Sequence, residues 1–173
     1  MLTKQEFLEN PVRMVRSEGV KGRILMMYPT DPTDGNSYPL MYEKEKNTIC
    51  ERVKALCEKY KPKKVLEIGF GLGYTATVFQ EYGVEEHTII EAHPKIFKKA
   101  VKWAEQYKGN NINLINCFFQ DYKYEVGSYD LILDDRFEIC HDLNGIVTPR
   151  YTVKDKMGWG QVYNNQDRIN LTE

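Results

Sequence analysis

Residues 64–74 read KVLEIGFGLGY, and this stretch decides how the rest of the chain is interpreted. A short apolar run at 64–69 leads directly into glycines at alternate positions, Gly69, Gly71 and Gly73. An apolar run that ends in glycines is typical of a buried parallel strand that turns sharply into a helix. Glycines at such a turn let the backbone approach a ligand closely, and the start of the next helix offers free N–H groups.

Strands and helices alternate regularly after this turn. We predict helices over 74–82 and 94–107, and strands over 88–91, 113–119 and 129–134. Alternation at this spacing argues for β-α-β crossovers and a parallel sheet. The predicted fold class is therefore α/β: a Rossmann-like, doubly wound, mostly parallel sheet with helices on both faces. Because little of the sequence follows the last of these strands, we expect the sheet to be truncated after the fourth or fifth strand.

The sequence divides into three regions. Residues 1–39 form an N-terminal segment and loop that we expect to cover the ligand site, residues 40–153 form the Rossmann-like domain, and residues 154–173 form an irregular polar tail. We expect a short helix at Lys4–Leu8, for which Thr3 is a candidate N-cap.

Three more local predictions concern the ends of the domain. Pro29–Pro39 is dense in Pro, Asp and Gly, which indicates a loop. Leu40–Tyr60 is predicted to be a helix, because its apolar residues recur at spacings of three and four. Gly145–Val153 is a candidate for one more strand, which Pro149 would confine to an edge or a bulge.

Composition excludes several classes of protein. The chain has 173 residues and a formal net charge of −1, so it has no global attraction to nucleic acid or anionic lipid. Its apolar runs are far shorter than the roughly 20 residues of a membrane span, and its N-terminus has no basic start followed by an apolar block. We therefore expect a soluble, cytoplasmic domain that binds neither nucleic acid nor a membrane.

The cysteines and histidines do not suggest a metal site. No C-x-x-C pair occurs, and the three histidines do not combine with cysteines at a spacing typical of zinc ligands. Cys50 and Cys57 lie seven residues apart, which places them on one helix face as small apolar residues. We predict no metal.

The spacing of the glycines indicates which ligand the turn receives. A dinucleotide fingerprint, G-x-G-x-x-G, needs its third glycine at position 74, and that residue is Tyr74. The observed spacing is G-x-G-x-G, and Glu67 precedes it by two positions. A carboxylate beside the turn repels a pyrophosphate but suits a ligand that carries an ammonium or sulfonium group.

Two later segments supply the remaining contacts that a nucleoside needs. Glu91 ends the next strand, where a carboxylate can accept hydrogen bonds from both ribose hydroxyls. Phe119-Gln120-Asp121 closes the third strand, where the aromatic ring can stack on adenine and the acid can hydrogen-bond to it.

These motifs together resemble class I S-adenosylmethionine-dependent methyltransferases. The run VLEIGFGLGYTATVFQEYGVEEHTIIEAHP, followed by FFQDY and YDLILDD, more narrowly resembles guanidinoacetate N-methyltransferase and the related arginine δ-N-methyltransferase. The resemblance is good over residues 64–135 and poor after them, which suggests a C-terminally short member of the group. Its cofactor would be S-adenosylmethionine.

The resemblance implies a set of site residues. Residues 69–74 would contact the amino acid end of the cofactor, Glu91 the ribose, and Phe119 with Gln120 the adenine. The enzymes of this group also use a Met and an acid from a segment before the sheet, for which residues 26–28 (MMY) and Asp31 or Asp34 are candidates. The full set of predicted cofactor contacts is Glu67, Gly69, Phe70, Gly71, Leu72, Gly73, Tyr74, Glu91, Ala92, Phe119, Gln120 and Asp121.

Asp134 and Asp135 are the candidate catalytic residues. Adjacent side chains on a strand point to opposite faces, so at most one of them normally reaches a given pocket. The other would cap a helix or pair with Arg136. Because ligands bind outside the carboxyl ends of parallel strands, we favour Asp135 as the residue that faces the ligand.

Three functions remain open at this point. The resemblance implies an N-methyltransferase that acts on a guanidino group of a small molecule or of arginine. Because fold does not select the acceptor, methylation of another small-molecule oxygen or nitrogen is an alternative. A non-catalytic regulatory module that binds S-adenosylmethionine is a third, and it predicts cofactor binding without turnover and a homodimer that covers an exposed sheet edge.

Overall fold

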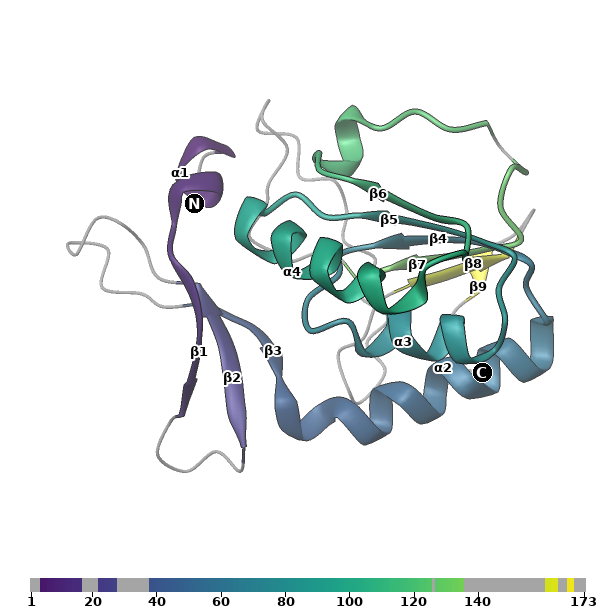
Figure 1. Ribbon diagram of the computed structural model, residues 1–173, viewed down its shortest axis with the longest axis horizontal. Coiled ribbons are helices and arrows are strands. Elements are labelled where there is room, and N and C mark those ends of the chain that lie inside the picture. Colours follow the sequence, from purple (N-terminus) through teal and green to yellow (C-terminus); the bar gives the residue numbers. More distant parts are fainter. Residues whose placement is uncertain are drawn as a thin grey trace.

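A six-stranded sheet forms the centre of the computed structural model, which describes residues 4–16, 22–27, 38–125, 127–135, 161–164 and 168–169. Its strand order is β6-β5-β4-β7-β8-β9, and neighbours among β4 (Lys64–Ile68), β5 (Glu86–Ile90), β6 (Ile112–Ile115) and β7 (Leu131–Asp134) pair in parallel. The chain winds outward from β4 through β5 and β6 and then returns to β7 on the other side of β4 (Figure 1). This reversal of strand order confirms the predicted doubly wound fold.

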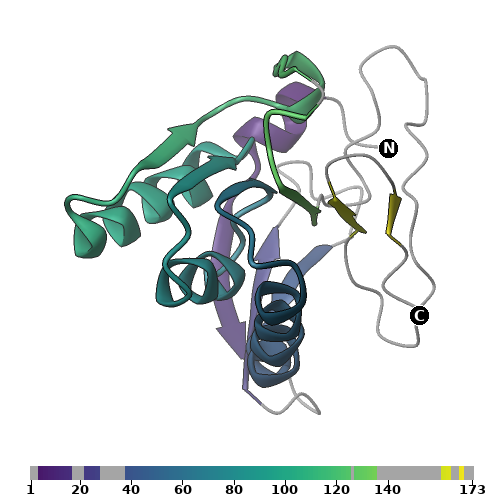
Figure 2. The same cartoon turned by 90° about the vertical axis from the view of Figure 1, so that its right-hand side faces the viewer.

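The strand order continues beyond β7 with two short antiparallel strands. β8 (Gln161–Asn164) pairs with β7, and β9 (Arg168–Ile169) pairs with β8 (Figure 2). The prediction of an irregular tail over 154–173 is therefore wrong for these two segments, because the open edge of β7 offers backbone groups with which a strand can pair. The predicted strand over Gly145–Val153 lies outside the described residues.

One face of the sheet is covered by α2 (Lys46–Tyr60), α3 (Tyr74–Glu81) and α4 (Pro94–Ala104), as Figure 1 shows. All three helices contribute buried side chains to one core cluster, together with alternate residues of β4, β5 and β7. The predicted crossover helices are confirmed as α3, between β4 and β5, and α4, between β5 and β6, because each of these connections places its helix against the sheet.

The opposite face carries a second, smaller core. It contains Leu66, Ile68, Ile90 and Tyr129, and it is covered by side chains of β6 and of the segment around the short helix η3 (Phe119–Asp121). No α-helix packs on this face among the described residues, so these residues show one of the two predicted helix layers. Covering on both faces explains why the last four residues of β4 and of β5 are all buried.

The N-terminal region forms α1 (Lys4–Glu9) and a separate antiparallel sheet of β1 (Val12–Arg16), β2 (Arg23–Met27) and β3 (Tyr38–Tyr42). Figure 1 shows this sheet standing beside the larger one. The short helix at the N-terminus is confirmed, and Thr3 lies outside the described residues.

The predicted helix over 40–60 begins later than expected. Residues 38–42 pair with β2, a 3-10 turn, η1 (Glu43–Glu45), follows, and α2 begins at Lys46. The pairing overrides the helical spacing, because Met41 is buried as part of the core cluster that it shares with β2. Residues 29–37 of the predicted loop lie outside the described residues, and its last two residues belong to β3.

In the described ranges no helix has both the length and the apolar character that crossing a bilayer requires.

Candidate cofactor site

A cavity lies where β4, β5 and β7 end, at the point where the strand order reverses. We call it the edge cavity. Ligands of open α/β sheets bind at this position. Its lining among the described residues consists of Phe7, Leu40, Met41, Ile68, Gly69, Gly71, Ile90, Glu91, Ala92, Ile96, Cys117, Phe118, Phe119, Gln120 and Asp135.

The segment 69–73, the glycine turn, forms the wall of the edge cavity above β4. The Gly69 N–H donates to the carbonyl of Ile90 at 2.8 Å, which joins the start of the turn to the end of β5. Gly71 has φ +55°, and a Cβ there would lie 2.9 Å from Met41 Cε. The left-handed backbone conformation favours glycine here, whereas the flexible end of Met41 could move aside for a Cβ.

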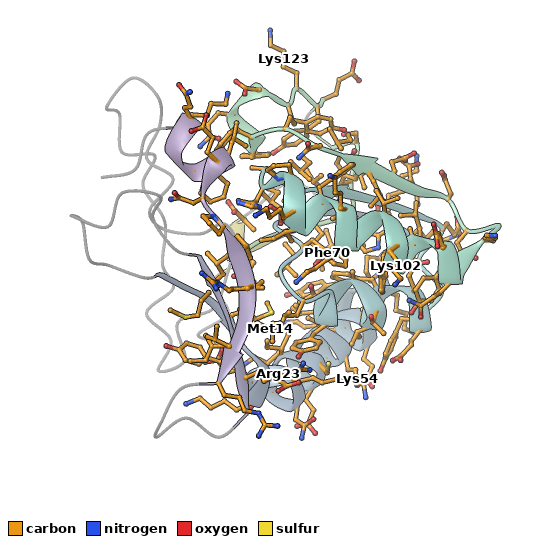
Figure 3. The ribbon with its side chains drawn as sticks, turned by 60° about the vertical axis from the view of Figure 1, so that its left-hand side comes forward. Met14, Arg23, Lys54, Phe70, Lys102 and Lys123 are labelled. Atoms are coloured by element: carbon orange, nitrogen blue, oxygen red, sulfur yellow. The ribbon has the colours of Figure 1, made fainter. Side chains whose placement is uncertain are left out.

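Phe70 lies beneath the turn and does not line the edge cavity. Its side chain is 3% exposed and packs edge-on against Trp103, with ring centroids 5.5 Å apart. Figure 3 shows Phe70 in the interior of the molecule, whereas Lys123 projects outward. Leu72, Gly73 and Tyr74 are likewise absent from the lining, so of residues 69–74 the structure brings only Gly69 and Gly71 to the cavity.

Glu91 is the polar centre of the lining. Its carboxylate accepts from the N–H of Phe70 at 2.9 Å and from the N–H of His93 at 2.7 Å, and the N–H groups of Gly71 and Ala92 also act on it. Burial raises the pKa of the Glu91 carboxyl, and these four backbone donors oppose the shift. A carboxylate held rigidly in this way, at the wall of a cavity, is suited to accept hydrogen bonds from a diol.

Glu67, the acid of the glycine motif, does not line the edge cavity. Its side chain is completely buried on the helix-covered face of the sheet, where one oxygen accepts from the Thr75 hydroxyl and the other lies 2.9 Å from His87 Nε2. Alternation along β4 places Glu67 on this face, whereas its neighbours Leu66 and Ile68 belong to the smaller core.

The wall opposite the glycine turn comes from the segment after β6. Phe119 and Gln120, the predicted adenine contacts, line the edge cavity together with Cys117 and Phe118. Asp121 does not: its side chain is half exposed and forms an ion pair with Lys4 of α1. The role predicted for Asp121, a contact to adenine, therefore finds no support in its position.

The N-terminal segment is expected to cover the ligand site, and α1 contributes to the lining through a residue that no sequence motif singles out. Phe7 lines the edge cavity, and its ring packs against His93 and Phe118 with centroid separations of 5.3 and 5.6 Å. The ring nitrogen Nε2 of His93 lies 2.9 Å from the carbonyl oxygen of Asn10, which ties the end of α1 to the start of α4. A six-residue helix far from the motif in sequence thus becomes part of the site only through packing.

Among the described side chains, the methionine in the lining is Met41, and Met26 is not part of it. Met41 belongs to β3, which precedes α2, whereas residues 26–27 end β2. The candidate acids Asp31 and Asp34 lie outside the described residues. The sequence pattern places Met41 inside the helix predicted over 40–60 and therefore does not single it out.

Only one of the two adjacent aspartates faces the edge cavity. Asp135 lines it, and its backbone N–H donates to the carbonyl of Ile68 at 2.9 Å, which fixes it beside the glycine turn. Asp134 is the last residue of β7 and is not part of the lining. The structure thus separates the pair as strand alternation requires.

The lining has the chemistry of a nucleoside site. It combines the buried carboxylate of Glu91 with aromatic and aliphatic walls and with two glycines that permit close approach. A second carboxylate, Asp135, lies at the other end of the row β5-β4-β7. No cluster of three or more His, Cys, Asp or Glu side chains suited to a metal ion occurs in the part of the chain that the structure describes.

Fold and lining together define a Rossmann-like domain of the methyltransferase class. The family profile of guanidinoacetate N-methyltransferase matches residues 37–144, which is more than half of the sequence, and the chain belongs to this family. The match confirms the family predicted from the sequence, whose members use S-adenosylmethionine.

Solved structures also match, at low identity. One is the YcgJ protein from Bacillus subtilis, with 22% identity, a TM-score of 0.41, and coverage of 47% of this chain and 36% of the other. A second is the SAH-bound methyltransferase of Podospora anserina, with 24% identity, a TM-score of 0.44, and coverage of 56% and 42%. A third is a protein-L-isoaspartate O-methyltransferase, with 20% identity, a TM-score of 0.40, and coverage of 76% and 39%. The aligned part of this chain thus spans well under half the length of each.

Proposed function

We propose that the chain binds S-adenosylmethionine in the edge cavity and transfers its methyl group to a guanidino nitrogen of a small molecule or of arginine. The observation that carries the proposal is that Glu91, after β5, and Asp135, after β7, line one cavity on either side of the glycine turn. Membership of the family, matched over residues 37–144, supports it.

The residues present fit the cofactor. Glu91 is placed to accept from the ribose hydroxyls, and a hydrogen bond to a charged group contributes about 1.5–3 kcal/mol. Phe119 and Ile96 offer apolar surface for the adenine, and Gly69 with Gly71 lets the amino acid end approach the backbone. When bound, S-adenosylmethionine supplies a methyl group that its sulfonium makes electrophilic.

Asp135 provides the chemistry that the acceptor needs. A carboxylate can pair with two N–H groups of a guanidinium and so orient one nitrogen. Removing a proton from a guanidinium, whose pKa lies far above neutral pH, costs roughly 9 kcal/mol at pH 7. Asp135 would accept this proton as the nitrogen bonds to the methyl carbon and the bond from that carbon to sulfur breaks, which leaves S-adenosylhomocysteine. Because positioning alone contributes about 7–11 kcal/mol in favourable cases, orientation and proton transfer together are adequate in size.

The test is a transfer assay with three acceptors. The protein is incubated with methyl-labelled S-adenosylmethionine and with guanidinoacetate, arginine or an arginine-containing peptide, and the products are analysed by mass spectrometry for the gain of one methyl group. We expect transfer to at least one of them, and we expect Asp135→Asn to lower the rate by a factor of about 100 to 10,000, the typical contribution of a general base. Asp134→Asn, outside the lining, is the matched comparison and should lose far less.

Each negative result removes a different part of the proposal. Absence of transfer to all three acceptors would remove the guanidino assignment, and full activity of Asp135→Asn would remove the role of its carboxylate. Calorimetry with S-adenosylmethionine, with NAD as a control, separates these cases from a failure to bind the cofactor. Binding without turnover on any acceptor would favour the regulatory module.

A further inference from the structure

A connected chain of polar side chains lies under the glycine turn, outside the edge cavity. The Thr75 hydroxyl donates to Glu67, whose other carboxylate oxygen lies 2.9 Å from His87 Nε2. His87 Nδ1 lies 3.0 Å from Gln80 Nε2, and Asn110 Nδ2 donates to Gln80 Oε1 at 2.8 Å. The first four of these side chains are at most 7% exposed. None of the five lines the edge cavity, so the proposed reaction does not use them directly.

The orientation of the Asn110 and Gln80 amides gives a consistent direction to the hydrogen bonds among these five side chains. Because Asn110 donates to the amide oxygen of Gln80, Gln80 turns its NH₂ group toward His87. An amide nitrogen only donates, so His87 Nδ1 accepts and the ring hydrogen sits on Nε2, from which it donates to Glu67. Both oxygens of Glu67 are thereby engaged by protein donors.

These hydrogen bonds join the two ends of the glycine turn. Glu67 lies in β4, just before the turn, and Thr75 lies in the first turn of α3, just after it. Their hydrogen bond spans the loop between them, and His87 connects the same carboxylate to β5. Gln80 makes a second connection from α3 to β5, near the other end of the helix. The start of α3 is therefore fixed against two strands of the sheet.

We propose that Glu67, Thr75 and His87 are positioning residues that hold the glycine turn in the conformation that receives the cofactor, without contacting the cofactor themselves. The inference rests on the proposed function, because it assigns a purpose to the turn. It replaces the direct contact between Glu67 and a cationic ligand that the motif suggests. Glu67 is completely buried, and both of its carboxylate oxygens contact protein partners, so the carboxylate does not face the edge cavity.

The first test compares two substitutions at Thr75 by calorimetry. Thr75→Val removes the hydroxyl and keeps the shape, whereas Thr75→Ser keeps the hydroxyl. We expect Thr75→Val to weaken the binding of both S-adenosylmethionine and S-adenosylhomocysteine about tenfold, the factor that corresponds to a weak charge-assisted hydrogen bond. Thr75→Ser should bind as the wild type does. The control is Thr88→Val, which removes another buried hydroxyl, on the opposite face of β5, and should leave both affinities unchanged.

The comparison of the two ligands separates positioning from direct attraction. The sulfonium charge is present in S-adenosylmethionine and absent in S-adenosylhomocysteine. If Glu67→Gln weakened only the first ligand, Glu67 would act through its charge on the sulfonium, and the positioning role would be overturned. Unchanged binding of both ligands by Thr75→Val would also overturn it. In the transfer assay we expect Thr75→Val to raise the cofactor KM by a larger factor than it lowers kcat.

A second measurement needs no ligand. The Gly73 N–H donates to the Phe70 carbonyl at 2.8 Å, and the Thr77 N–H donates to the Gly73 carbonyl at 3.0 Å, so amide hydrogen exchange at these two positions reports the turn itself. We expect exchange about tenfold faster in Thr75→Val and unchanged in Thr75→Ser. Asn110 is the exposed last member of this series of hydrogen-bonded side chains, so Asn110→Ala is a milder variant. It should also make exchange at these two amides faster, by a smaller factor.

The exchange measurement also keeps the two proposals distinguishable. If the wild-type protein bound neither ligand, the proposed function would fail, while faster exchange in Thr75→Val would still support the role of these residues in the turn. If exchange at Gly73 and Thr77 were the same in all variants, the positioning role would be overturned whatever the ligand measurements showed.

Discussion

Replacing Gly73 by alanine should destabilise the protein severely, for two reasons that the structure separates. Gly73 has φ +74°, and a left-handed conformation costs an alanine about 1–2 kcal/mol. A Cβ at this position would also lie 2.5 Å from Phe70 Cζ. Phe70 is 3% exposed and is held against Trp103, so its ring cannot move away without opening the core. Overpacking of this kind costs about 1–3 kcal/mol.

The expected loss is therefore about 2–5 kcal/mol in the free energy of unfolding, a large part of the 5–15 kcal/mol typical of a domain. Gly83→Ala is the matched control, because Gly83 has φ +71° and a Cβ there would meet nothing within 4 Å. It should lose only the backbone part. Urea denaturation of both variants, followed by circular dichroism, measures the difference. Equal losses in Gly73→Ala and Gly83→Ala would refute the steric argument, whereas recovery in Gly73→Ala combined with Phe70→Leu would support it.

Two further predictions concern titratable groups. Burial raises the pKa of the Glu91 carboxyl above the ordinary value of 4.5, so its charged form is lost at a higher pH than in an exposed glutamate. The affinity for S-adenosylmethionine, measured by calorimetry, should therefore fall on acidification before other carboxylates titrate. An affinity that stays unchanged down to pH 4.5 would contradict this. Burial raises the pKa of the Cys57 thiol to about 12, so at pH 8 iodoacetamide should modify Cys57 only after unfolding, and peptide mass spectrometry of the native protein would detect any early reaction.

The sequence by itself determined the parallel sheet and the position of its ligand edge. An apolar strand that ends in alternating glycines has few other structures available, and β4, the turn and α3 form where the motif predicts. The sequence also predicted that Glu91 and Asp135 lie at the ends of β5 and β7, because acids that directly follow buried strands lie at the edge of the sheet.

Which side chains face the cavity was decided by the tertiary structure. Glu67 and Phe70 belong to the motif in sequence, yet alternation along the strand and packing under the turn direct both into the interior. Asp121 forms an ion pair with Lys4, which is more than a hundred positions away in the sequence, and no local pattern predicts such a partner.

The N-terminal region, in contrast, lies outside the motif in sequence and yet supplies Phe7 and Met41 to the lining of the edge cavity. A sequence motif encodes conformation and approximate direction over a few residues, whereas the surroundings of a side chain depend on segments that meet only when the chain is folded. Burial and contact between distant segments are therefore properties of the whole fold, and they determine which residues line the edge cavity.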